Sequence, residues 1–271
     1  MPEEYRFLNL HGEQLFAAHH RPLRPASRAI VMCHPLGEEK LWSHRVFVSF
    51  ARDMAAAGFE VLRFDVRGEG DSSRAFEQSD LETRIEDTCL AVDAVREVND
   101  SVTDVTLMGL RFGAIVAAIT ASRRNDISRL VLWDPILDGA AYMQAVLRLN
   151  LMYQMAQHHK VIENRDVLVA RLTRGETVNI EGYELSERLF RQTSEFRLRE
   201  VLATFRGETA LLQINQNEAS VRPELLELSG ASPKYRVDSA REEPFWKEIK
   251  TFYQRAPQLT QATRQLLGPM S

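Results

Sequence analysis

Short apolar runs alternate with amphipathic stretches in the first half of the chain, and this alternation restricts the possible folds. The apolar runs predict strands at 29–33, 60–64, 105–108 and 129–133, and the amphipathic stretches predict helices at 43–57, 79–98 and 112–122. Strands that are apolar along their whole length are covered on both faces, and the intervening helices supply that cover. The sequence therefore predicts an α/β protein with a mostly parallel sheet and helices on both faces.

The pattern changes between residues 137 and 206, where the strand signal disappears. Helices are predicted there at 141–160, 164–174 and 186–196. Strands return at 209–214 and 234–237, a last helix is predicted at 244–253, and the polar tail from residue 256 is expected to be mobile. We therefore predict a core formed by residues 1–136 and 207–271 and an inserted helical lid formed by residues 137–206.

Charge and composition argue against several classes of function. The 34 Lys and Arg residues against 38 Asp and Glu residues give a net charge of −4. The chain therefore lacks the excess of basic residues that is typical of nucleic-acid-binding proteins. The charged N-terminus does not resemble a signal peptide, and no apolar run reaches the roughly 18 residues of a membrane span. Two cysteines are too few for a disulfide framework. We expect a cytoplasmic protein with no nucleic-acid or membrane partner.

A glycine frame joins the strand at 105–108 to the helix at 112–122. The segment reads Gly109-Leu110-Arg111-Phe112-Gly113-Ala114. It resembles the nucleophile elbow of the α/β-hydrolase fold, a sharp, strained turn that lifts one side chain above the sheet. In that family the raised residue is serine, whereas in this chain it is Arg111.

Two other segments carry the same resemblance. His34-Pro35-Leu36-Gly37 is similar to the loop that supplies one oxyanion-hole N–H group, and residues 65–72, DVRGEGDS, are similar to the family's D-x-R-G-x-G-x-S loop. The resemblance covers most of the chain and is strongest to the serine-aminopeptidase-like branch of the α/β-hydrolase fold. Within that branch, GLRFGA and the segment EGYELS at 181–186 resemble the hydrolase-like proteins associated with exosortase A systems. That likeness implies a role linked to surface-protein sorting or exopolysaccharide production.

The catalytic groups of such a hydrolase are missing from their usual places. Arg111 cannot act as the nucleophile because its guanidinium stays protonated at any working pH. The acid normally follows the strand at 209–214, where Glu218 is the candidate carboxylate. The histidine normally follows the last strand, but that loop offers only Glu242 and Glu243 as carboxylates, and no histidine occurs after His159. We therefore predict a pseudoenzyme without ordinary acyl-enzyme chemistry, which binds a small anionic ligand or a protein partner.

Two roles remain open for Arg111. A helix N-terminus attracts anions, and a guanidinium adds a planar fork for carboxylate or phosphate. Arg111, with the N–H groups of Phe112 and Leu36, could therefore bind a small anionic or acyl-type ligand. Alternatively, Arg111 forms an ion pair with Asp134, which ends the neighbouring strand.

Two further functions also stay open. One is a hydrolase or acyltransferase with a rebuilt site that uses His34, Asp134 or a lid residue as acid or base. The other is a dimeric scaffold that associates through an apolar lid. No cofactor is expected, and no His or Cys spacing indicates a metal site, because the adjacent histidines 158 and 159 point in different directions on a helix.

Overall fold

The computed structural model describes residues 2–216, 221–248 and 253–268, and within them eight strands form one central sheet. The strands are β1 (Glu3–Leu10), β2 (Glu13–His20), β3 (Arg28–Cys33), β4 (Glu60–Phe64), β5 (Asp104–Leu110), β6 (Arg129–Trp133), β9 (Glu208–Asn215) and β10 (Tyr235–Arg241). Their order across the sheet is β1-β2-β4-β3-β5-β6-β9-β10. The strands from β4 to β10 pair in parallel, whereas β1, β2 and β4 pair antiparallel. The predicted mostly parallel sheet is confirmed.

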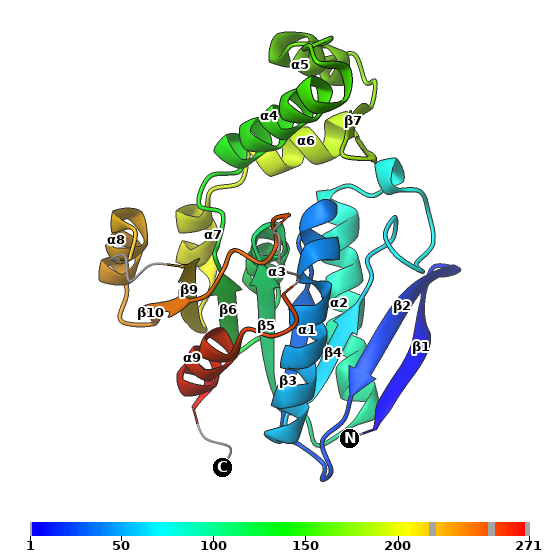
Figure 1. The fold of residues 1–271 in the computed structure, drawn as a ribbon. Coiled ribbons are helices and arrows are strands. Elements are labelled where there is room, and N and C mark those ends of the chain that lie inside the picture. The colour runs from blue at the N-terminus through cyan, green and yellow to red at the C-terminus, as the bar shows by residue number, and fades with distance from the viewer. Residues whose placement is uncertain (1, 217–220, 249–252, 269–271) are drawn as a thin grey trace.

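Helices cover both faces of this sheet (Figure 1). One face packs against α1 (Glu38–Ala56) and α9 (Pro257–Leu267), and the other packs against α2 (Leu81–Val98), α3 (Phe112–Arg123) and α7 (Leu198–Thr204). Strand β3 shows how the sequence builds these two layers. Ile30 and Met32 join the apolar cluster on the first face, and the alternate residues Val31 and Cys33 join the cluster on the second.

Within residues 137–206, the part before α7 lies beyond the carboxyl ends of the parallel strands (Figure 1). These residues form α4 (Gly139–His158), α5 (Arg165–Thr173) and α6 (Glu187–Ser194). They also form a small antiparallel hairpin, β7 (Val178–Ile180) with β8 (Tyr183–Leu185), so the predicted absence of strands in this insertion is wrong. The division of the chain into a core and a separate lid stays a prediction.

The end of the chain differs most from expectation. Residues 244–248 form a turn instead of the start of a helix, and the rest of the predicted helix is partly outside the described residues. The last helix is α9, so the expectation of a mobile tail from 256 is wrong. Its pattern can be read in hindsight, because Pro257 opens the helix and Leu259, Ala262 and Leu267 bury one face of it.

Two shorter elements complete the description. The helix α8 (Pro223–Ala231) precedes β10, and a 3₁₀ turn, η1 (Phe76–Gln78), precedes α2. Within the described ranges, no helix combines the length and the apolar character that crossing a membrane requires.

Candidate functional site

The turn between β5 and α3 has the geometry of the predicted elbow. Arg111 occupies the turn with φ 54° and ψ −115°, a strained conformation for a residue other than glycine. A Cβ on Gly109 would lie 2.2 Å from the carbonyl oxygen of Gly113, and a Cβ on Gly113 would lie 2.2 Å from that of Cys33. Both flanking positions therefore require glycine, which explains the frame seen in the sequence.

The Arg111 side chain is held by two carboxylates and two aromatic rings. Its Nε lies 3.3 Å from Oε1 of Glu39, and its Nη1 lies 3.4 Å from Oδ2 of Asp134. The guanidinium carbon lies 5.5 Å from the ring centre of Tyr142 and 5.6 Å from that of Trp246. The ion pair with Asp134, one of the two roles left open by the sequence, is present, and Glu39 adds a second.

Partial burial makes the charges of this cluster depend on one another. Burial lowers the pKa of Arg111, but Glu39, Tyr142 and Asp134 together raise it by more. The pKa of Arg111 therefore lies above its ordinary value. Burial raises the pKa of Glu39, although Arg111 acts against that shift. Burial and the nearby Glu39 raise the pKa of the Tyr142 hydroxyl well above its usual range. The hydroxyl of Tyr142 donates to Oε2 of Glu39 over 3.4 Å.

Asp134 is shared between two arginines. Its Oδ1 lies 3.4 Å from Nη2 of Arg222, which approaches from the start of α8. Its backbone has φ 39°, and its N–H group donates to the carbonyl oxygen of Leu212 over 2.7 Å. Arg111 and Arg222 therefore face Glu39 and Asp134, so the four charges cancel. A ligand anion would meet a neutral cluster rather than a free guanidinium.

His34 does not face this cluster as a free acid or base. Its ring stacks on Phe47, with the ring centres 4.5 Å apart, and packs in the interior beside Lys40. Burial first, and then the charges of Lys40 and Arg63, hold the pKa of His34 well below its ordinary value. The imidazole is therefore neutral at physiological pH, and its burial favours the loop-shaping role.

The loop that normally carries the histidine holds Glu242 and Glu243 in this chain. Glu218 lies outside the described residues. Glu242 is buried, but it accepts hydrogen bonds from the Tyr253 hydroxyl over 2.6 Å and from the Gln258 N–H group over 2.8 Å, so it ties down the C-terminal segment. Neither Glu242 nor Glu243 lines the cavity beside Arg111. The same loop instead supplies Trp246, whose ring faces the guanidinium.

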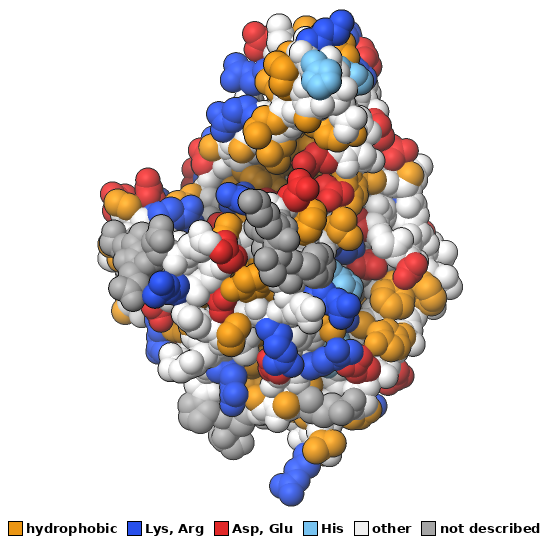
Figure 2. Space-filling model, in the orientation of Figure 1, with side chains coloured by type: hydrophobic (Ala, Val, Ile, Leu, Met, Phe, Trp, Pro, Cys, Tyr) orange, Lys and Arg blue, Asp and Glu red, His pale blue; other side chains and the backbone are white. Residues whose placement is uncertain are grey.

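A small cavity of about 50 Å³ lies close to the elbow, between the start of α1 and the insertion. Its walls are mostly apolar, and three carboxylates stand among them; Figure 2 shows acidic side chains gathered among apolar ones below the insertion. The lining residues are Leu36, Gly37, Glu38, Glu39, Phe76, Tyr142, Val146, Leu149, Ile180, Glu181, Tyr183 and Leu185. Leu36 thus lines this cavity, whereas Phe112 lies fully buried beneath, with its ring 6.1 Å from that of Tyr142.

Sequence reasoning missed four residues of this site: Glu39, Tyr142, Arg222 and Trp246. Glu39 offered a signal, since it stands in the first turn of the helix that follows the His34–Gly37 loop. The other three come from α4, the start of α8 and the loop after β10, and nothing in their local sequence marks them.

The D-x-R-G-x-G-x-S loop forms a separate buried network. Arg67 bonds to Asp87 from its Nε over 2.6 Å and from its backbone N–H over 2.7 Å, and it also bonds to Glu13 and Glu86. Asp65 pairs with Lys40 over 2.7 Å. Contacts from Arg67 and Asp65 to neighbouring elements therefore hold this loop in place.

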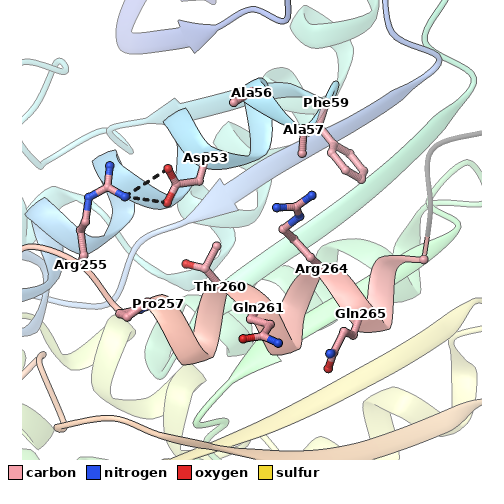
Figure 3. A pocket seen from close by; sticks show the side chains of 11 residues that line it. Asp53, Ala56, Ala57, Phe59, Arg255, Pro257, Thr260, Gln261, Arg264 and Gln265 are labelled. Carbon is pink, nitrogen blue, oxygen red and sulfur yellow. Dashed lines mark hydrogen bonds and ion pairs between the residues drawn. The ribbon is translucent and has the colours of Figure 1, made fainter.

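A larger groove of about 910 Å³ lies elsewhere, between the end of α1 and α9 (Figure 3). The ion pair between Asp53 and Arg255 stands at its edge (Figure 3). Asp53 comes fourteen residues after Glu39 on α1, which corresponds to roughly 21 Å along the helix axis. The groove is thus separate from the elbow.

Across the described ranges, no three His, Cys, Asp or Glu side chains are grouped so that they could hold a metal ion.

Comparison with known proteins places this site in context. The family model described as serine aminopeptidase, S33, matches residues 24–202. The structure of Est1E from Butyrivibrio proteoclasticus with ferulic acid bound has a TM-score of 0.70 and 18% identity, with 97% of each chain covered. The structure of DcsB with its substrate analogue has a TM-score of 0.64 and 16% identity, again with 97% of each chain covered. The thioesterase domain from the curacin biosynthetic pathway has a TM-score of 0.57 and 16% identity, with 97% of this chain and 99% of that chain covered. A search of curated proteins finds no match.

Proposed function

Because the chain belongs to the serine aminopeptidase, S33, family and has the α/β-hydrolase fold, we propose that it is a non-catalytic member that binds a small acyl-type molecule beside the elbow. The observation that carries this proposal is Arg111 at the nucleophile position, paired with Glu39 and Asp134. The elbow is retained as a framework, while the residue it presents has become part of an ion-pair cluster.

The chemistry of the cluster supports the loss of acyl-enzyme catalysis. Acyl transfer in this fold needs a nucleophile and a base that accepts its proton. Arg111 offers no lone pair, and the hydroxyl of Tyr142 has a pKa well above its usual range, so it stays protonated. His34 is packed against Phe47, and the described loop that would carry the histidine contributes Trp246 instead.

The lining of the cavity favours an apolar, uncharged group over an anion. Leu36, Val146 and Leu185 offer apolar contacts, while Glu38 and Glu181 place negative charge at the same cavity. Burial, together with Glu38 and Glu248, raises the pKa of Glu181. An alkyl or acyl chain would gain from the apolar walls, whereas a free carboxylate would be repelled. Ligands named for the similar structures, ferulic acid among them, belong to those proteins and support only the general class.

We also propose a cellular setting for this binding protein. The two segments that resemble exosortase-associated proteins meet at the cavity, since Glu181 and Tyr183 line it and Arg111 stands beside it. This juxtaposition supports a role in surface-protein sorting or exopolysaccharide production, exerted from the cytoplasm. Cells that lack the protein should then change in one of these two outputs, and cells that show neither change would contradict this setting.

Absence of catalysis is tested with p-nitrophenyl esters and a fluorophosphonate probe. We expect no turnover above buffer and no covalent labelling, for the wild type and for Arg111→Ser alike, because the variant gains a hydroxyl but no base. An active esterase of the same fold serves as the positive control. Turnover by the wild type would overturn the proposal and favour a hydrolase with a rebuilt site.

Ligand preference is tested by calorimetric titration with hexanol, hexanoate and hexylamine. We expect hexanol to bind more tightly than hexanoate, because the carboxylates at the cavity repel an anion. Val146→Trp should abolish binding by filling the cavity, while Leu226→Trp, on the exposed side of α8, serves as the matched control. Preferential binding of hexanoate that Arg111→Ser abolishes would instead identify Arg111 as an anion receptor.

A further inference from the structure

Exposed apolar side chains are concentrated at the far end of the insertion. Within the described ranges, twelve large apolar side chains are exposed, and six of them lie between residues 152 and 167. These six are Met152, Tyr153, Met155, Val161, Ile162 and Val167. Single exposed apolar residues are ordinary on a soluble protein, but a contiguous group marks an interaction surface. We call these apolar residues, together with the basic residues Arg148 and Lys160, the tip surface.

Basic side chains surround these apolar ones. Between residues 148 and 176 the chain carries five Lys and Arg residues and three Asp and Glu residues, whereas the whole chain has a net charge of −4. The three acidic residues pair with arginines of the same segment, Glu163 and Glu176 with Arg171 and Asp166 with Arg165. In the part of the chain that the structure describes, the exposed Arg148 and Lys160 form no ion pair. The tip surface is therefore locally positive.

Helix α4 presents the two kinds of side chain on one side. Met152 and Met155 are spaced by three residues, which places them on one face of the helix, and Arg148 lies four residues before Met152 on the same face. The opposite face is occupied, because Asn150 and Gln154 are buried and bond to the carbonyl oxygens of Asn179 and Glu163. Val161 and Ile162 extend the exposed face into the loop before α5.

The shape of the molecule makes this surface accessible to a plane. The ends of α4 and α5 project furthest from the central sheet (Figure 1), and Figure 2 shows apolar, basic and histidine side chains gathered over this end of the molecule. A flat surface could touch the tip without meeting the body of the protein.

We propose that the tip surface docks on an anionic lipid surface. Apolar side chains that protrude among basic ones are suited to the boundary between lipid headgroups and acyl chains, where the apolar groups insert and the basic groups meet lipid phosphates. Such peripheral binding needs no membrane span, so it agrees with the helices observed. It departs from the expectation of no membrane partner, which rested on the absence of a span in the sequence.

Charge argues against a second copy of the chain as the occupant. In a symmetric dimer the same patch faces itself, so Arg148 and Lys160 would approach their own counterparts. Like charges in that arrangement repel, whereas the phosphates of an anionic bilayer attract the same residues. The convex form of the tip also suits a plane better than a partner pocket.

The full-length protein should be tested by cosedimentation with vesicles of phosphatidylcholine, with and without phosphatidylglycerol. We expect binding to the vesicles that contain phosphatidylglycerol, little binding to phosphatidylcholine alone, and weaker binding as salt is raised. Failure of the wild type to bind the anionic vesicles would overturn the proposal. The assay requires no occupant of the cavity, so its result does not depend on the proposed function.

Matched substitutions locate the binding surface. Ile162→Glu should weaken vesicle binding about tenfold, because it removes an inserted apolar group and adds negative charge. Leu226→Glu, an equally exposed apolar position on α8, should leave binding unchanged. Arg148→Glu should weaken binding, and Arg24→Glu, at an exposed position between β2 and β3, is its control outside the insertion. Equal losses at test and control positions would overturn the proposal, as would a dimer in light scattering that Ile162→Glu dissociates without any vesicle binding.

Discussion

Arg67 lies in the loop after β4 and Arg111 in the turn after β5, yet the two side chains are held very differently. The side chain of Arg67 is only 2% exposed, and its contacts with Asp87 and Glu13 measure 2.6 and 2.7 Å. The side chain of Arg111 is 20% exposed, and its carboxylate contacts measure 3.3 and 3.4 Å. Short contacts in a buried setting fix Arg67 as a structural tie. The contacts of Arg111 are longer and lie beside aromatic rings. Replacing Arg111 should therefore cost less folding stability than replacing Arg67.

The comparison also separates two meanings of a retained motif. The D-x-R-G-x-G-x-S loop persists because its residues bond to α2 and β2, which the fold needs whether or not the protein is an enzyme. In the elbow, the close packing of Gly109 and Gly113 against backbone atoms fixes the turn, while Arg111 contributes through its side-chain contacts. The glycine frame is therefore evidence for the fold rather than for a particular reaction.

The largest expected effect comes from Arg67→Met. Removing this arginine leaves the buried carboxylate of Asp87 without its charged partner, which should lower the free energy of unfolding by about 3–5 kcal/mol. Urea unfolding at neutral pH measures the change. The double variant Arg67→Met with Asp87→Asn should recover part of the loss, because it removes the unpaired charge and keeps an acceptor for the backbone N–H. A loss below that of Arg111→Met would reverse the comparison.

A third arginine, Arg63, extends the comparison. It is buried, and its partner, His20, is neutral at physiological pH. Arg63 donates from Nε to Nε2 of His20 over 3.0 Å, and burial first, then the charge of Arg63, lowers the pKa of His20 to about 4. The folded state thus binds this proton more weakly than the unfolded state. The stabilising contribution is complete above pH 6.5 and is lost as the pH falls to 4, by about 3 kcal/mol at about 1.4 kcal/mol per pKa unit.

Urea unfolding between pH 7 and pH 4 measures that loss. His20→Gln keeps a hydrogen-bond acceptor but does not titrate, so its stability should fall less steeply over the same interval. Parallel pH profiles for the wild type and this variant would show that His20 is not responsible.

The smallest effect is expected for Arg111→Met, at about 1 kcal/mol or less near pH 5, because its contacts are long and partly exposed to solvent. Burial already raises the pKa of Glu39, and loss of Arg111 should raise it further. The folded variant then binds a proton more tightly than the unfolded chain, so its stability should decline as the pH rises above 4.5. Adding Glu39→Gln should remove this decline, and persistence of the decline would assign it to another group.

Local patterns made most of the fold predictable. The central strands could be identified because buried parallel strands are apolar throughout, and the elbow could be placed because two glycines flank a strand-to-helix turn. The last helix was misplaced because Phe245 and Trp246 are core residues within a turn, whereas α9 buries only a narrow apolar stripe.

The site was less predictable than the fold, because its contacts join distant segments. Arg111 meets Glu39, 72 positions earlier, through side-chain geometry that no local pattern encodes. Trp246 reaches the guanidinium from a loop that the sequence marked only by its missing histidine. Arg111 at the elbow and the lack of histidine after position 159 could thus be read from the sequence, while the side chains that contact Arg111 could not.

The cavity beside the elbow has a kinetic consequence. At about 50 Å³ it has room for a few water molecules, far below the several hundred Å³ of a typical ligand pocket. A molecule as large as hexanol can therefore enter only when Tyr183 and Val146, which form walls from the insertion, move apart. Entry would be gated by this opening, so the observed association rate should level off at high ligand concentration instead of rising in proportion to it.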